Sequence, residues 1–276
     1  DLRALNGRLS VEAGIYDRTT DGIISRITLP NTNELFVTNL GSITNKGVEV
    51  ALGWNDKIGK DFTYSFSPNF SINKNKVESI GDGFNFQLLG NGNVNRAIAG
   101  ESIGHFFGYK QIGIYQTIGQ VEEVPGPDGA LPGDIMYEDT NKDGKLTPED
   151  RVNLGSPFPK WNYGFNFSMG YKKFDFLLQG QGVAGNYVYT ERRTQSFAIL
   201  NYESNRLNAW TGPGSTNVEP ILNNSRTNNL LFSDHYLEPG DYFRLRTVQL
   251  GYTLISKGLK KTFVKGGRLY VSGQKI

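Results

Sequence analysis

The chain has 276 residues, with 29 basic and 27 acidic side chains and a formal net charge of +2. So small a charge gives no argument for nucleic acid or another polyanion as a partner. The absence of cysteine excludes disulfides, thiolate metal sites and cysteine nucleophiles. The two histidines, His105 and His235, disfavour a zinc centre.

The composition favours strands and loops over helices. No run of about 18 apolar residues occurs, so no transmembrane helix is predicted. The 34 glycines, 17 phenylalanines and frequent asparagines predict no helix longer than about two turns. A membrane β-barrel is compatible with this composition, because every second residue of a membrane strand is polar.

Period-two alternation predicts the first three strands. They cover residues 8–18, 45–55 and 62–72, and the third is the longest. After the first strand we expect a bulge at Thr19–Asp21. In the third strand Pro68 lacks an N–H group and predicts a local bulge or bend.

Residues 73–159 contain no long strand of this kind. They hold a short β-like stretch at 106–115, a Pro/Gly-rich stretch at 124–132 and an acidic loop at 139–150. In a membrane barrel we therefore expect this segment to be one long excursion on a single side of the membrane.

The clearest element is Lys160–Gln181, which predicts a long-stranded hairpin with its turn at Lys172–Lys173. A soluble strand normally carries charged or threonine side chains on its wet face, but the polar face here is small and uncharged. The first arm is about as long as the ~9–11 residues that a tilted strand needs to cross a bilayer. The hairpin favours a membrane barrel and leaves a soluble β-sandwich as the alternative. One face of the first arm consists of Trp161, Tyr163, Phe165, Phe167, Met169 and Tyr171.

A second excursion covers residues 182–239, and a further strand is predicted at 241–254. Its apolar residues change from odd to even positions, which predicts a β-bulge near Arg246–Thr247. Residues 268–273 begin another strand, and Arg244 and Arg246 are expected to line a lumen or to snorkel at its rim.

The connections alternate in length. They are short at 56–60, 172–173 and 255–267, and long at 29–44, 73–159 and 182–239. Bacterial outer-membrane barrels have short periplasmic turns and long extracellular loops. The chain supplies about seven strands, too few to close a wide barrel. Because it begins without Met or a signal peptide and ends inside a predicted strand, we expect it to be part of a longer protein.

The acidic loop matches a calcium-binding loop. Asp139, Asn141 and Asp143 supply side-chain oxygens at positions 1, 3 and 5, Lys145 offers its backbone carbonyl at position 7, and Asp150 stands at position 12. An EF-hand has a bidentate Glu at position 12, so the shorter Asp weakens the match. The alternative is a solvated turn without an ion. We predict a structural Ca²⁺ as the only cofactor.

Two short motifs resemble enzyme signatures and are rejected. Gly100–Gly104 has the spacing of a nucleophile elbow, but nothing after it is predicted to be helical. Gly180–Gly185 has the spacing of a dinucleotide fingerprint, but an extended segment follows instead of a helix. We therefore predict no catalytic residues.

Aromatic residues are frequent in the long connections. Beside Asn and Gln they suit sugar or peptide binding, but packing of the loops is the favoured role for each. The residues are Phe84, Phe86, Phe106, Phe107, Tyr109, Tyr115, Tyr187, Tyr189, Phe197, Tyr202 and Trp210.

Six stretches, in the same order and over nearly the whole chain, resemble the SusC/RagA family of TonB-linked outer-membrane transporters of Bacteroidetes. They are Asn39–Val50, Gly133–Gly144, Pro159–Gly164, Tyr171–Asn186, Asp241–Tyr252 and Arg268–Gln274. The chain departs from the family at its end, where Lys275 and Ile276 replace the usual Asn-Leu-Phe.

The resemblance implies an all-β fold, an antiparallel transmembrane β-barrel of which residues 1–276 are the C-terminal part. The complete barrel would have 22 strands and long extracellular loops, and the N-terminal plug and TonB box would be absent here. It also implies import of a glycan, oligosaccharide or peptide across the outer membrane. The implied partners are a SusD-like surface lipoprotein, the TonB-ExbB-ExbD complex and outer-membrane lipid. The alternative from the residues is a soluble extracellular carbohydrate-binding β-sandwich with a calcium-stabilised loop.

Overall fold

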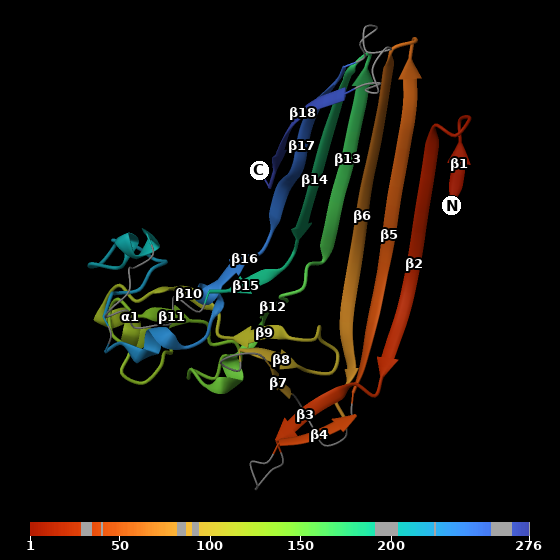
Figure 1. Cartoon of the computed structure of the whole chain (residues 1–276). Coiled ribbons are helices and arrows are strands. Elements are labelled where there is room, and N and C mark those ends of the chain that lie inside the picture. Colours follow the sequence, from red (N-terminus) through yellow and green to blue (C-terminus); the bar gives the residue numbers. More distant parts are fainter. Residues whose placement is uncertain are drawn as a thin grey trace.

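The computed structural model describes residues 1–28, 35–39, 41–81, 87–89, 94–190, 204–223, 225–254 and 267–275. Its largest element is one eight-stranded antiparallel sheet, with β1 and β18 at its two edges (Figure 1). The strand order is β1 (Leu2–Ala4), β2 (Leu9–Asp21), β5 (Ser42–Ile58), β6 (Phe62–Ser79), β13 (Trp161–Tyr171), β14 (Phe174–Ala184), β17 (Tyr242–Leu254) and β18 (Gly267–Gln274).

The predicted hairpin is confirmed and forms the middle of this sheet. β13 and β14 pair without interruption from Trp161 opposite Ala184 to Tyr171 opposite Phe174. Because side chains alternate between the two faces of a strand, Phe167 and its cross-strand partner Leu178 lie on one face of the sheet. The polar residues that alternate with such apolar residues along the strands lie on the other face. The alternation in the sequence therefore becomes one apolar and one polar face.

The strand predictions need three corrections. The ladder between β2 and β5 continues through Thr19–Asp21 without a bulge. Backbone pairing can continue there because it does not require the side chains to alternate between apolar and polar. Pro68 causes no change of register, and pairing with β5 is interrupted beside it, where Leu52 and Gly53 pass, because proline cannot donate. The sheet has eight strands rather than about seven.

The bulge in β17 is confirmed. Gln179 lies opposite Thr247 and Gly180 lies opposite Leu245, so Arg246 is the extra residue. This insertion explains the change from odd to even positions along the strand.

The two ends of the sheet differ, as the connection lengths predicted. Figure 1 shows the turn between β5 and β6 and the turn between β13 and β14 together at one end. At the other end lie the long connections, two of which begin later than predicted because β6 runs to Ser79 and β14 to Ala184. We call the described residues between β6 and β13 and between β14 and β17 the loop region.

The loop region has its own small sheets. One has the order β12 (Val152–Gly155), β9 (His105–Gly108), β8 (Asn95–Ala97), β7 (Gln87–Leu89). The expected stretch at 106–115 is thus two strands in two sheets, because β10 (Gln111–Ile114) pairs with β11 (Ile135–Tyr137) instead. β15 (Tyr187–Tyr189) pairs with β16 (Leu237–Pro239), and β3 (Ile24–Thr28) with β4 (Leu35–Asn39) forms a separate hairpin.

Helices are few and short in the described part of the chain. The one α-helix there is α1 (Ile118–Glu123), and Thr117 caps its N-terminus. Within the described ranges, no helix has the length and apolar character needed to cross a membrane. Four 3₁₀ turns lie in the loop region, η2 (Pro148–Asp150), η4 (Ser204–Asn208), η5 (Thr227–Leu230) and η6 (Asp234–Tyr236).

Candidate functional site

The apolar face of the eight-stranded sheet is not covered by any other described element. Phe66, Phe70 and Trp161 are 41%, 39% and 40% exposed although their rings contact neighbours on the same face. Among the described residues, the one buried apolar side chain within this sheet is Val77, near the end of β6. A face of this kind requires an apolar environment outside the chain.

In the middle of the sheet the polar face carries uncharged hydrogen-bonding groups. Gln179 Nε2 donates to Asn166 Oδ1 at 2.8 Å, and the hydroxyls of Ser65 and Ser168 are 2.7 Å apart. Arg246 lines a shallow depression on this face, consistent with the predicted lining of a lumen. The depression is also lined by Asn69, Asn162, Gly164, Asn166, Gln181 and Tyr242.

The loop region, unlike the sheet, has a buried core. Tyr109, Ile114, Ile135 and Tyr137 form one apolar cluster and are at most 8% exposed. Val77 joins Ile80 and Ala97 in a second cluster, which attaches the end of β6 to the loop region. The third contains Val94, Phe106 and Leu237.

Asp134 is a fully buried carboxylate that ties the two excursions together. Its oxygens accept from the backbone N–H of Leu131 at 3.0 Å, Arg226 Nη1 at 2.9 Å and Asn229 Nδ2 at 3.0 Å. Asn229 Oδ1 in turn accepts from the N–H of Ile135 at 2.8 Å. Since a buried carboxylate is stable only when its oxygens are satisfied, this arrangement fixes η5 against β11.

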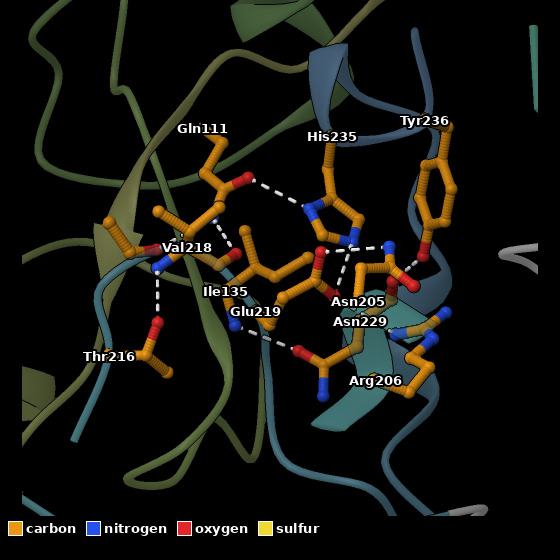
Figure 2. A network of polar contacts seen from close by, with 11 residues as sticks. Gln111, Ile135, Asn205, Arg206, Thr216, Val218, Glu219, Asn229, His235 and Tyr236 are labelled. Atoms are coloured by element: carbon orange, nitrogen blue, oxygen red, sulfur yellow. Dashed lines mark hydrogen bonds and ion pairs between the residues drawn. The ribbon is translucent and has the colours of Figure 1, made fainter. Parts of the chain in front are cut away.

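Glu219 is the centre of a second buried network, shown in Figure 2. Asn205 Nδ2 donates to Glu219 Oε1 at 3.2 Å, and Arg206 Nη1 lies 3.5 Å from Oε2. His235 Nε2 is 3.9 Å from the same oxygen, and its Nδ1 is 3.1 Å from Gln111 Oε1. These contacts hold η4 and η6 against β10.

Burial shifts the pKa values of two ionisable groups in the loop region. Burial raises the pKa of Tyr115 to about 12, and the charge of Asp134 adds to the shift. The neutral phenol of Tyr115 donates to the backbone carbonyls of the two residues that directly follow α1. Burial also raises the pKa of Asp234, although its carboxylate accepts from the N–H of Gln111 at 2.7 Å. Both side chains form hydrogen bonds to backbone groups inside the loop region.

The predicted calcium loop is closed by its own hydrogen bonds. Asp139 accepts from the N–H groups of residues 142 and 144, and Asp143 from that of Lys145. Asn141 accepts from the N–H of residue 143. Asn141, Asp143 and Lys145 are exposed, whereas Asp150 is fully buried.

Asp150 already accepts several hydrogen bonds in this arrangement. Its two oxygens accept from the N–H groups of Thr140, Asn141 and Thr147, and it forms a capping box with Thr147 at η2. As a calcium ligand it would have to give up some of these donors. Among the described residues, no group of three or more His, Cys, Asp or Glu side chains is arranged to hold a metal. Calcium binding therefore stays a prediction.

Most of the described aromatic residues of the loops pack inside the loop region, the role that the sequence favoured for them. Phe106, Tyr109 and Tyr115 are buried, and Trp210 donates to Gln116 Oε1 at 3.1 Å. Tyr187 is 40% exposed. Phe84, Phe86, Phe197 and Tyr202 lie outside the described residues.

Neither enzyme-like motif is followed directly by a helix. Gly100–Gly104 leads directly into β9, and Gly180 lies inside β14, which is followed by β15. Neither position has the helix that the corresponding chemistry requires. Sequence reasoning missed Asp134, Arg226, Glu219 and Asn229, although Asp134 lies in one of the stretches that carry the resemblance.

The chain resembles several curated proteins, although no family model matches it. It is 30% identical over 288 residues to TonB-dependent receptor P26 of Formosa agariphila, an alignment that covers 98% of the chain and 28% of the relative. It is 25% identical over 280 residues to TonB-dependent receptor SusC of Bacteroides thetaiotaomicron, covering 99% of the chain and 27% of the relative.

Solved structures of the RagAB peptide transporter have the same fold. One superposes with a TM-score of 0.80 at 22% identity and covers 99% of the chain and 30% of that structure's chain. RagAB in its 'closed-closed' state gives a TM-score of 0.76 at 23% identity. The chain thus spans somewhat more than a quarter of the length of the curated relatives cited. The sheet, its alternation of short and long connections and these likenesses identify the chain as a relative of the TonB-dependent receptors of the SusC/RagA family.

Proposed function

We propose that this chain forms part of the wall and the extracellular loops of an outer-membrane importer for a nutrient. The observation that carries the proposal is the uncovered apolar face of the eight-stranded sheet, with short turns at one end and the packed loop region at the other. This is the arrangement of an outer-membrane barrel, with lipid against one face and a polar lumen against the other.

The complete importer would be energised through the TonB-ExbB-ExbD complex and would work with a SusD-like surface lipoprotein. The likeness to SusC and to the RagAB transporter supports this assignment. The substrate class is a glycan, an oligosaccharide or a peptide, and the RagAB structures are those of a peptide importer. The wall would enclose the path and the loop region would contact the substrate at its mouth.

The soluble β-sandwich is the weaker hypothesis. A sandwich buries the apolar face of each sheet against a second sheet. Here Phe66 and Met169 on that face are 41% and 37% exposed, and no described sheet lies over them. An enzymatic role has no support in the two motifs, because neither lies at a helix start.

Fractionation of cells that produce the full-length protein tests the proposal. We expect the protein in the outer-membrane fraction, soluble only in detergent. Recovery as a water-soluble monomer would contradict it. Uptake is tested separately, by comparing the import of labelled oligosaccharides and peptides between cells with and without the gene. Equal uptake of every substrate would contradict the import function.

We also propose that one Ca²⁺ stiffens the loop at 139–150. The support for this proposal is that the side chains of Asp139, Asn141 and Asp143 each accept a hydrogen bond from a backbone N–H group within the loop, which folds the loop around these three side chains. Calorimetric titration of the full-length protein with CaCl₂ should give binding heat that Asp139→Ala abolishes and Asp128→Ala leaves unchanged. Equal heats for wild type and Asp139→Ala would refute the site.

A further inference from the structure

Three exposed lysines gather at the short-turn end of the sheet. Lys60 lies in the turn between β5 and β6, and Lys172 and Lys173 form the turn between β13 and β14. We call these three residues the basic collar. Figure 1 shows both turns together, at the end of the sheet opposite the loop region.

Backbone hydrogen bonds join the collar into one row. The N–H of Lys172 donates to the carbonyl of Asp61 at 3.1 Å, which links the two turns. The N–H of Thr253, at the end of β17, donates to the carbonyl of Lys173 at 2.8 Å. The collar therefore extends over the ends of four adjacent strands, from β5 to β14, and reaches β17.

The collar lysines have no carboxylate partner among the described residues, whereas the arginines nearby do. Arg8 pairs with Asp56 at 3.2 Å, and Arg268 pairs with Asp175. Asp61 is the single acidic residue in the two turns and forms no ion pair with a described residue. The short-turn end thus presents positive charge that the described chain does not neutralise.

A row of aromatic rings lies directly beside the collar on the apolar face. Phe62 and Tyr171 are 6.5 Å apart between ring centroids, and Phe174 and Tyr252 are 4.7 Å apart. Tyr64 extends the row, with its ring 5.9 Å from that of Phe62. In membrane barrels, rings of this kind lie at the boundary between hydrocarbon and headgroups.

Two of the lysines extend over this aromatic row. The Nζ atom of Lys172 lies 5.2 Å from the ring centroid of Tyr171, and that of Lys173 lies 6.0 Å from the centroid of Tyr252. The ammonium groups are therefore on the side of the sheet that faces lipid, just beyond the rings. That is the depth at which lipid phosphates lie.

The backbone of Lys172 adds an independent observation. Its φ is +55°, in the left-handed region that two-residue hairpins normally fill with glycine or asparagine. A lysine here is unfavourable for the turn itself. A cation placed at such a position is consistent with a role outside the folding of the hairpin.

We propose that the basic collar binds the phosphate of an anionic phospholipid in the leaflet at the short-turn end. The proposal rests on the membrane location given under the proposed function and adds a specific lipid contact to it. Aromatic rings for the acyl and glycerol part and unpaired ammonium groups for the phosphate match an anionic phospholipid. The alternative ligand, an acidic soluble protein, would not contact aromatic rings that face the hydrocarbon.

The experiment uses the full-length protein in vesicles of dioleoylphosphatidylcholine with increasing dioleoylphosphatidylglycerol. The readout is phosphatidylglycerol enrichment around the protein, from fluorescence quenching by a brominated form of that lipid. Each lysine near a surface adds about fivefold in affinity, so Lys60→Gln, Lys172→Gln and Lys173→Gln together should lower it on the order of 100-fold. An unchanged affinity in the triple variant would overturn the proposal. Binding of an acidic partner protein would then be the alternative role of the collar.

Lys142 offers a matched control, because it is also an exposed lysine with a positive φ, +60°, but lies in the loop region. Lys172→Gly and Lys142→Gly each relieve an unfavourable backbone conformation. We expect only Lys172→Gly to weaken phosphatidylglycerol binding, by about fivefold. Equal effects of the two variants would overturn the proposal. Normal insertion into phosphatidylcholine vesicles without any preference for the anionic lipid would refute the collar alone, whereas failure to insert would refute the proposed membrane location.

Discussion

The eight-stranded sheet and the loop region solve the problem of stability in different ways. The sheet has long uninterrupted ladders but almost no buried side chain, and its apolar residues remain exposed to whatever surrounds the chain. The loop region has short strands but three apolar clusters and two buried polar networks. The sheet therefore depends on an apolar environment for its outer face, while the loop region is internally packed like a water-soluble domain.

The largest effect should come from the centre of the loop region. Asp134→Ala leaves Arg226 and Asn229 without their buried partner, and we expect a loss of about 4 kcal/mol in local stability. Hydrogen exchange of residues 131–137 and 225–236 measures it. The exposed control Asp128→Ala should change stability by less than about 0.5 kcal/mol. Loss of protection in β13 and β14 as well would show that the two regions are not independent.

A charge on the sheet should distinguish its two faces. Phe167→Arg places a guanidinium on the apolar face near the middle of β13, and we expect a loss of about 3 kcal/mol in vesicles. The neighbouring Asn166→Arg places the same charge on the polar face and should cost less than about 1 kcal/mol. The measurement is denaturant unfolding of the full-length protein in vesicles. Similar losses for both variants would mean that the faces do not meet different environments.

A smaller effect should depend on pH. Burial alone would raise the pKa of Asp150, but the N–H groups of Thr147, Asn141 and Thr140 lower it below the usual value. The folded state therefore binds this proton less tightly than the unfolded chain. The stabilisation is complete above the ordinary pKa of about 4 and is lost as the pH falls through the lower folded value.

Asp150→Asn should remove that dependence together with about 2 kcal/mol of loop stability near neutral pH, since a cap and charged hydrogen bonds are lost. Limited proteolysis of the loop at 139–150 between pH 6 and pH 3 measures it. Glu149→Gln is the control, because Glu149 is exposed and its N–H is only a donor to Thr147. If wild type and Asp150→Asn lose protection in parallel on acidification, Asp150 is not the titrating group.

Much of the sheet could be predicted from the sequence, because alternation is a local signal. The β13–β14 hairpin and the bulge at Arg246 follow directly from which positions are apolar. No bulge occurs at Pro68, since the proline removes pairing toward β5 only and the ladder to β13 continues. β1 is a three-residue strand, too short for alternation to be visible.

The loop region could not be predicted in the same way. The partners of Asp134 lie 92 and 95 residues further along the chain, and His235 lies 124 residues from Gln111. No periodic pattern connects such positions. Asp150 was identified by its spacing as a ligand candidate, but spacing alone does not show that backbone N–H groups already surround its carboxylate.

The contacts of Asp134 also set an order of events during folding. Asp134 lies in the first excursion, yet its partners Arg226 and Asn229 lie beyond the whole hairpin, in the second excursion. Until these residues are in place the β10–β11 pair lacks the partners that close it. The wall strands β13 and β14 can pair locally within that interval, so the loops of this protein should mature last, after the strands that support them.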